Sequence, residues 1–136
     1  MPVAIKRAYE DPLPDDGYRV LVDRLWPRGV SKARAKLDAW MREIAPSHEL
    51  RRWFHADPSR WDEFRERYLA ELAGAEDALR PLARRAGEGR VTLVTGAKYG
   101  RNHAVVLKER LEQLVSEKHI GSQLGEGDRN TFIEPL

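Results

Sequence analysis

Cysteine is missing from this chain of 136 residues. Its absence excludes disulfide bonds, thiolate metal sites and catalysis by a cysteine nucleophile, and it fits a reducing compartment. Long apolar runs are also missing, since no stretch approaches the roughly 20 residues that a membrane-spanning helix needs. The first residues lack the apolar core of a signal peptide. We therefore expect a cytoplasmic protein that does not enter a membrane.

The chain also lacks a strong excess of charge of one sign. It has 24 basic and 22 acidic residues and a formal net charge of +2, so its charge is mixed, whereas dedicated DNA-binding proteins usually carry a dense basic stripe. None of its four histidines stands in the close His pairs that are typical of zinc sites. The sequence therefore predicts no metal site, it indicates no cofactor, and it signals nucleic-acid binding only weakly.

Three segments are predicted to be β-strands, at residues 3–7, 18–25 and 90–95. The last of these is apolar without alternation, as is typical of strands that are buried on both faces. Between the first two strands, residues 11–17 have turn chemistry at almost every position and predict a loop.

Apolar residues at helical spacing predict helices around these strands. Their expected ranges are residues 31–45, 47–54, 57–74, 76–86 and from 102 onward, and the expected N-caps of the first three are Ser31, Ser47 and Asp57. The first segment is either one helix or two, because Asp38 offers a second N-cap, and Pro81 should kink or split the fourth. Long helical connections between few strands favour an α/β fold, with a parallel or mixed sheet of three or four strands covered by helices. We expect a single domain over residues 1–118, followed by a loosely ordered tail over residues 119–136.

The segment Asp-Arg-Leu-Trp-Pro-Arg-Gly at residues 23–29 follows the second predicted strand. In α/β domains, ligands bind beyond the carboxyl ends of the strands. Arg24 and Arg28 together fit a phosphate or carboxylate group, and Trp26 fits stacking on a planar ring. The alternatives are that Arg24 pairs with an internal carboxylate and that Trp26 is a core residue.

A second polar segment, Thr-Gly-Ala-Lys-Tyr-Gly-Arg-Asn-His at residues 95–103, joins the third predicted strand to the last helix. Backbone N–H groups at a helix start attract anions, and Lys98 and Arg101 add positive charge. We therefore expect Lys98, Arg101 and Asn102 to contact an anionic ligand. The segment is neither a Walker A loop nor a dinucleotide fingerprint, and the alternative is an ordinary turn with Asn102 as the helix cap.

His103 and Asp23 are the candidate acid and base. A histidine in the first turn of a helix is favoured in its neutral form, and beside a carboxylate such as Asp23 it fits a general base. The alternative is a capping or solvent-facing histidine. His55 either lies in the same cleft or closes a turn, and the turn is the favoured interpretation. If the second and third strands are parallel, the two polar segments meet at one edge of the sheet.

Four separated segments resemble, in the same order, the YeaO-like proteins, the family called domain of unknown function 488. They are VLVDRLWPRGVSK at residues 20–32, Trp40 with APS at residues 45–47, LRRWFHADPSRW at residues 50–61, and VTLV at residues 91–94 through NHAVVLK at residues 102–108. The resemblance extends to about residue 117 and implies a compact bacterial α/β protein of unknown activity, without catalytic residues to transfer. Similar sequences tend to have Tyr-Ala-Ala-Lys and then acidic residues in the loop after the third strand. This chain has TGAKYGR there, which is more basic and favours anion binding.

These observations together predict a small α/β protein that binds a phosphate-bearing or other anionic, nucleotide-like ligand in a basic cleft at the carboxyl edge of the strands. The first alternative is a small enzyme that acts on such a ligand, with His103 and Asp23 as acid and base. The second alternative is a nucleic-acid-binding or protein-interaction module.

Overall fold

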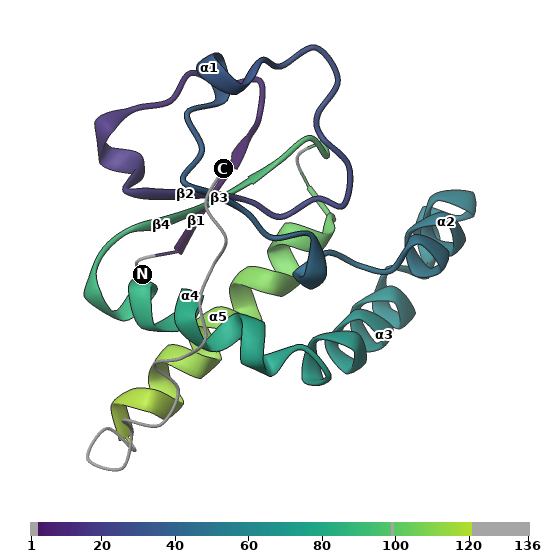
Figure 1. Ribbon diagram of the computed structural model, residues 1–136. Coiled ribbons are helices and arrows are strands. Elements are labelled where there is room, and N and C mark those ends of the chain that lie inside the picture. Colours follow the sequence, from purple (N-terminus) through teal and green to yellow (C-terminus); the bar gives the residue numbers. More distant parts are fainter. Residues whose placement is uncertain (1–2, 99, 121–136) are drawn as a thin grey trace.

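A computed structural model describes residues 3–98 and 100–120 of the chain (Figure 1). It contains a parallel sheet of four strands in the order β1-β4-β2-β3. The strands are β1 (Val3–Arg7), β2 (Tyr18–Leu21), β3 (Ala39–Trp40) and β4 (Val91–Thr95). The predicted α/β fold with a small, helix-covered parallel sheet is confirmed.

The helices that accompany the sheet are α1 (Lys32–Ala35), α2 (His48–Ala56), α3 (Trp61–Ala73), α4 (Glu76–Glu88) and α5 (His103–Ile120). Three short 3₁₀ turns, η1 (Pro14–Asp16), η2 (Arg42–Ile44) and η3 (Pro58–Arg60), lie between them. The predicted caps are confirmed, because the side chains of Ser31, Ser47 and Asp57 each accept a hydrogen bond from a backbone N–H of the following turn. No helix in the described ranges is long and apolar enough to cross a membrane.

Strand β4 is the centre of the sheet. It pairs with β1 on one side, where Val3 lies opposite Val91, and with β2 on the other, where Tyr18 lies opposite Val91. All five of its residues are buried. This burial on both faces agrees with its unbroken apolar sequence. Because the strands are parallel, the carboxyl ends of β1, β2 and β4 lie at the same edge.

Each face of the sheet packs on its own apolar cluster. Val20, Val91 and Leu93 point into the larger cluster, which includes residues of α3, α4 and α5, whereas Leu21 and Val94 point into a smaller cluster with α1. Figure 1 shows α4 and α5 on one side of the sheet and α1 with its loops on the other. The period of two along the strands thus divides their side chains between two helical layers.

The helix predicted over residues 31–45 is wrong beyond its first turn. Lys36 has a left-handed backbone with φ of 47°, which ends α1 there. Ala39–Trp40 then pairs with β2 as an edge strand, and the Met41 N–H donates to the Leu21 carbonyl at 2.9 Å. The apolar residues do have helical spacing, but the free edge of β2 supplies backbone partners that overrule it.

Two other boundaries differ from prediction. Strand β2 ends at Leu21 rather than at residue 25, because the chain turns into the polar segment earlier. Pro81 does not split its helix, which continues to Glu88, and its side chain is buried in the helical layer. Helix α5 runs to Ile120, and residues 121–136, most of the predicted tail, lie outside the described residues.

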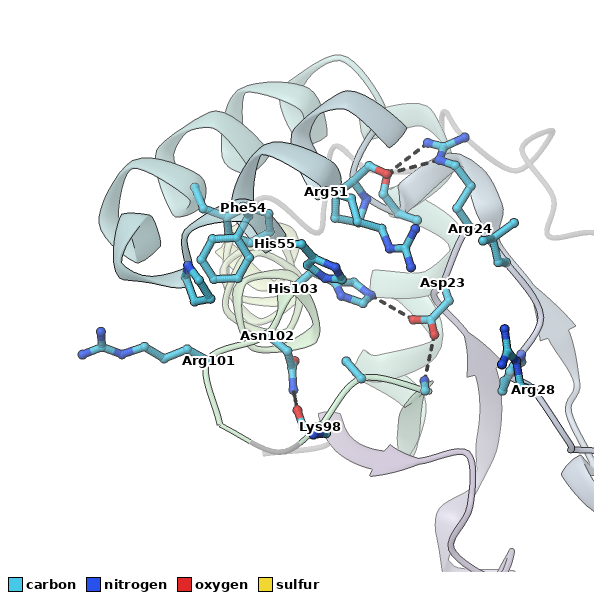
Figure 2. A pocket seen from close by; sticks show the side chains of 18 of the residues that line it. Asp23, Arg24, Arg28, Arg51, Phe54, His55, Lys98, Arg101, Asn102 and His103 are labelled. Atoms are coloured by element: carbon cyan, nitrogen blue, oxygen red, sulfur yellow. Dashed lines mark hydrogen bonds and ion pairs between the residues drawn. The ribbon is translucent and has the colours of Figure 1, made fainter.

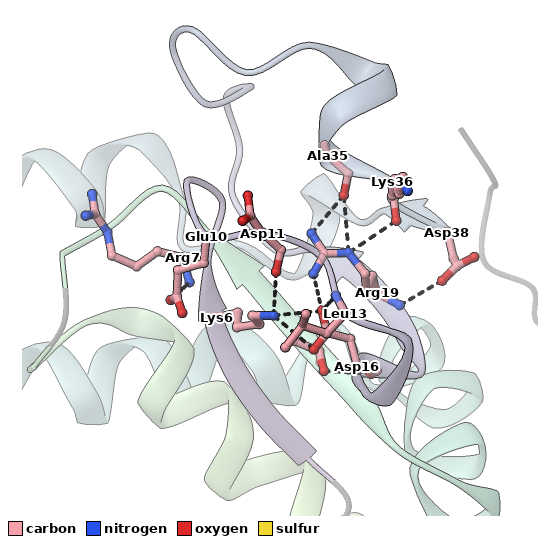
Figure 3. Close-up of polar contacts among 11 residues, drawn as sticks. Lys6, Arg7, Glu10, Asp11, Leu13, Asp16, Arg19, Ala35, Lys36 and Asp38 are labelled. Carbon is pink, nitrogen blue, oxygen red and sulfur yellow. Dashed lines mark hydrogen bonds and ion pairs between the residues drawn. The ribbon is translucent and has the colours of Figure 1, made fainter.

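A buried ion cluster joins the first two strands (Figure 3). The Asp16 carboxylate accepts hydrogen bonds from Lys6 Nζ at 3.0 Å, from Arg19 Nη1 at 2.7 Å and from the Leu13 N–H at 3.0 Å. Arg19 Nη2 also donates to the Ala35 carbonyl at 2.8 Å. Burial raises the pKa of Asp16, but these hydrogen bonds and the nearby positive charges outweigh it and bring the pKa below its ordinary value.

We predict that Asp16→Asn destabilises the protein at neutral pH by about 2 kcal/mol, because charge-assisted hydrogen bonds to two cations are lost. The native carboxylate stabilises the fold above its unfolded pKa of about 4, and this contribution is lost as pH falls through the lower folded value. Urea unfolding should therefore show a difference between the two proteins that shrinks below about pH 4. The control is Asp15→Asn, which removes an exposed charge from the same turn; an equal loss in both variants contradicts the prediction.

Tyr68 fixes α3 to η2 from within the core. Its side chain is fully buried, and its hydroxyl donates to the Ile44 carbonyl at 2.6 Å. We predict that Tyr68→Phe lowers the free energy of unfolding by about 1–3 kcal/mol, because a buried carbonyl loses its partner. Urea unfolding should show no comparable loss for Tyr18→Phe, whose half-buried ring lies under the Arg85 guanidinium.

Candidate functional site

A cavity of about 750 Å³ lies at the carboxyl edge of the sheet (Figure 2). Its walls are residues 23–28 after β2, residues 45–46, the side of α2 with Pro58, and residues 96–98 and 101–103 before and at the start of α5. The volume is in the range of sites that hold small molecules. The structure thus brings the two polar segments of the sequence together in one cavity.

Gly96 lies where the two segments meet. Its N–H donates to Asp23 Oδ2 at 2.7 Å, and a Cβ at this position would lie 3.4 Å from Oδ2 and 3.6 Å from the Cβ of Pro27. The end of β1 supports the same loop, because Arg7 Nε donates to the Ala97 carbonyl at 3.1 Å. The floor of the cavity is therefore built from the ends of three parallel strands.

Asp23 joins these strand ends to α5. Its Oδ1 accepts a hydrogen bond from Thr95 Oγ1 at 2.7 Å and lies 3.0 Å from His103 Nε2. Its Oδ2 accepts the hydrogen bond from the Gly96 N–H. Burial raises the pKa of Asp23, but the hydrogen bond and charge of His103 and the other two donors outweigh it and lower the pKa below its ordinary value. Asp23 is therefore an ionised carboxylate with both oxygens engaged, and it orients His103.

His103 is the first residue of α5, and its Nε2 also lies 3.1 Å from the Val22 carbonyl. The preceding residue, Asn102, acts as the helix cap: its Oδ1 accepts from the Ala104 N–H at 2.9 Å and its Nδ2 donates to the Lys98 carbonyl at 2.7 Å. The geometry thus fits the interpretation of Asn102 as a helix cap. Its side-chain amide borders the cavity, but both of its hydrogen bonds are to backbone groups.

Arg24 and Trp26 border the cavity, but their polar groups bind the protein. Arg24 donates to the carbonyls of Pro46 at 3.2 Å and Ala45 at 3.3 Å, so its partners are backbone groups rather than the internal carboxylate considered above. Trp26 Nε1 donates to the Val30 carbonyl, and its ring meets Trp40 edge-on, with ring centroids 5.4 Å apart. Both residues help to hold the turn in place.

Arg28, Lys98 and Arg101 have exposed side chains that border the cavity. Within residues 3–98 and 100–120, no hydrogen bond or ion pair engages their charged groups. Figure 2 shows the Arg101 side chain directed away from Asp23 and His103. Arg28 and Lys98 are therefore the predicted cations that the fold leaves available at the mouth of the cavity.

Sequence reasoning missed the contribution of α2. Arg51 and His55 both line the cavity, whereas the sequence favoured a turn for His55. Burial, the charge of Arg51 and the charge of His103 all lower the pKa of His55. The spacing of Arg51, Phe54 and His55 on one helix face was the available signal, but only tertiary packing directs that face toward the sheet edge.

The cavity has an unbalanced charge. Five basic side chains line it, Arg24, Arg28, Arg51, Lys98 and Arg101, against one carboxylate, Asp23. A concave site with cations of this number focuses a positive potential that attracts anions. In the described part of the chain, no group of three or more His, Asp or Glu side chains is arranged to hold a metal ion.

We predict that Asp23→Asn lowers the free energy of unfolding by about 1–3 kcal/mol at neutral pH, because the charge-assisted hydrogen bonds that its carboxylate accepts are lost. The native carboxylate has a lowered pKa, so its stabilisation is present above pH 4 and declines as pH falls through the folded value. Thermal or urea unfolding of the two proteins should therefore converge in acid. Glu43→Gln, which neutralises an exposed carboxylate on η2, is the control; if Asp23→Asn is as stable as this control, Asp23 does not join these elements as described.

Comparison with known proteins identifies the family. A sequence profile described as "Inactive DUF488-N3 subclade" matches residues 2–128. The uncharacterized protein YeaO of Escherichia coli (strain K12) is 47% identical over 115 residues, which are 84% of this chain and 100% of YeaO. The uncharacterized protein Rv3073c of Mycobacterium tuberculosis (strain ATCC 25618 / H37Rv) is 46% identical over 110 residues, which are 80% of this chain and 92% of the relative. No solved structure gives a significant match. The resemblance found in the sequence is confirmed, and the chain belongs to the DUF488 family of YeaO-like proteins.

Proposed function

We propose that this protein binds a small anionic ligand in the cavity at the carboxyl edge of its sheet. The observation that supports the proposal is the surplus of cations around the cavity, which is lined by five basic side chains and one carboxylate. Both oxygens of that carboxylate, Asp23, are occupied by protein donors. The cationic groups of Arg28, Arg51 and Lys98, called the basic rim below, are therefore left to an external anion.

The walls of the cavity favour a ligand that also has a planar, apolar part. Phe54 and Phe64 both line the cavity, and their rings stack with centroids 4.4 Å apart. Leu25, which is 61% exposed, and three prolines add apolar surface at its edge. An anion attached to a ring, as in a nucleotide, matches this combination of charge and apolar wall.

Binding without chemistry is the better-supported activity. Each oxygen of the Asp23 carboxylate already contacts a protein donor, and the description of the matching subclade includes the word "inactive". One observation favours the alternative of a small enzyme. An imidazole oriented by a carboxylate, as His103 is by Asp23 at 3.0 Å, is a common arrangement for a general base. That alternative requires turnover of a phosphate ester that His103→Gln abolishes while ligand binding persists.

The proposal is tested with the basic rim. We predict that inorganic phosphate and adenosine monophosphate stabilise the native protein in a thermal-shift assay, as any ligand of the native state does. Arg28→Ala, Arg51→Ala and Lys98→Ala should each weaken binding by about tenfold, because one charge-assisted hydrogen bond is lost. The matched control is Arg52→Ala, which removes the same charge from the neighbouring exposed position of α2, outside the cavity. Equal losses for Arg51→Ala and Arg52→Ala contradict binding in the cavity.

A further inference from the structure

We propose that the anion is a doubly charged terminal group, a phosphate monoester, held between α2 and the two strand-end segments, rather than the singly charged phosphodiester of a nucleic acid. This inference rests on the proposed function and specifies its ligand. It is carried by three features: the gathering of positive groups around the cavity, the concave shape of the site and the pairing of arginines elsewhere on the surface.

Two imidazoles and a guanidinium line the cavity next to each other. His55 and Arg51 face it from α2, and His103 faces it from α5 (Figure 2). The other charged groups around it are Asp23, Arg24 and Arg28 after β2, and Lys98 and Arg101 before α5. Asp23 is the one carboxylate of the cavity lining, so its single negative charge does not balance the surrounding guanidinium and ammonium groups. A ligand with two negative charges relieves this repulsion more fully than a ligand with one.

The shape of the site favours a ligand end over a polymer. A concave cavity of about 750 Å³ has the size of a small-molecule site, whereas single-stranded nucleic acid is bound along an extended basic groove. The two phenylalanines that line the cavity, Phe54 and Phe64, add an apolar wall that suits a ring attached to the anion.

Basic residues outside the cavity are largely committed to other groups. Arg65 pairs with Glu109 at 2.8 Å and Arg67 with Glu63 at 2.7 Å, and the Arg85 guanidinium lies over the Tyr18 ring at 3.9 Å. In contrast, the groups of the basic rim have no such partner among the described residues. A polymer would need further unpaired cations along its path, and these pairings leave few for it.

The inference predicts that ligand binding is coupled to proton uptake by His55. Burial, Arg51 and His103 lower the pKa of His55 in the ligand-free protein, and a bound dianion close to the imidazole raises it again. Binding should therefore take up protons, and it should tighten as pH falls through the raised pKa of His55 in the complex, because the imidazole of the ligand-free protein is still neutral there. Inorganic sulfate has the same double charge without titrating in this range, so its affinity should follow the same trend.

The experiment compares three probes by titration calorimetry with the full chain: phenyl phosphate, its monoanionic diester methyl phenyl phosphate, and a single-stranded oligonucleotide of about 12 nucleotides. We expect phenyl phosphate to bind at least about tenfold more tightly than the diester at pH 7. Titrations in buffers of different ionisation enthalpy should show proton uptake with phenyl phosphate. His55→Gln should abolish this uptake, while Arg52→Ala should retain it. NMR titration of the His55 ring should show its pKa rise when phenyl phosphate is bound.

The outcomes separate this inference from the proposed function. Arg28-dependent binding of the diester as tight as that of the monoester, or binding without proton uptake, overturns the monoester assignment and leaves anion binding intact. Tighter binding of the oligonucleotide, with a steep dependence on salt, assigns the cavity to nucleic acid instead. If none of the probes binds at millimolar concentration in an Arg28-dependent manner, the proposed function itself is overturned, and the inference with it.

Discussion

The hydrogen bonds of the Asp23 carboxylate are the interaction on which the functional edge of this protein depends. One side chain at the end of β2 accepts from Thr95 at the end of β4, from the N–H of Gly96 and from His103 at the start of α5. A buried carboxylate that gained only one of these partners would be costly to desolvate. With three, it remains charged and fixes the relative positions of two strands and a helix. The cavity walls that these elements carry are consequently set by one residue.

Asp16 and Asp23 are both carboxylates with lowered pKa values, yet they serve different ends. Asp16 is enclosed by Lys6 and Arg19, so its charge is neutralised within the fold. Asp23 is held by a hydroxyl, an amide and an imidazole, which leaves the arginines and the lysine around it without a carboxylate partner. The difference explains why one cluster only supports the sheet whereas the other borders a cavity with a positive potential.

The sequence predicted those parts of the fold that depend on local chemistry. The apolar run of β4 and the caps at Ser47 and Asp57 were sufficient to place a central strand and two helices. The segment at residues 31–45 was not predictable in this way, because its apolar spacing suits a helix and only the open edge of β2 selects a strand. Pro81 misled for a related reason, since burial in the helical layer compensates for the hydrogen bond that proline lacks.

The candidate site was likewise predictable from the sequence in some parts and not in others. Polar residues at two strand ends indicated a common location because parallel strands end at one edge, and the pairing of Asp23 with His103 followed from that. The sequence did not reveal that Arg24 and Trp26 would donate their hydrogen bonds to backbone carbonyls. It also did not reveal that α2 would contribute Arg51 and His55 to the cavity lining.

The sequence by itself determined the family, the α/β class and the edge of the sheet at which polar groups gather, because each of these follows from local order along the chain. Only the tertiary structure decided which cations remain available, since an arginine is free or engaged according to the carbonyls and carboxylates that packing brings within about 3 Å of it. Those partners come from segments that are distant in sequence, and their distances are not encoded in any local pattern.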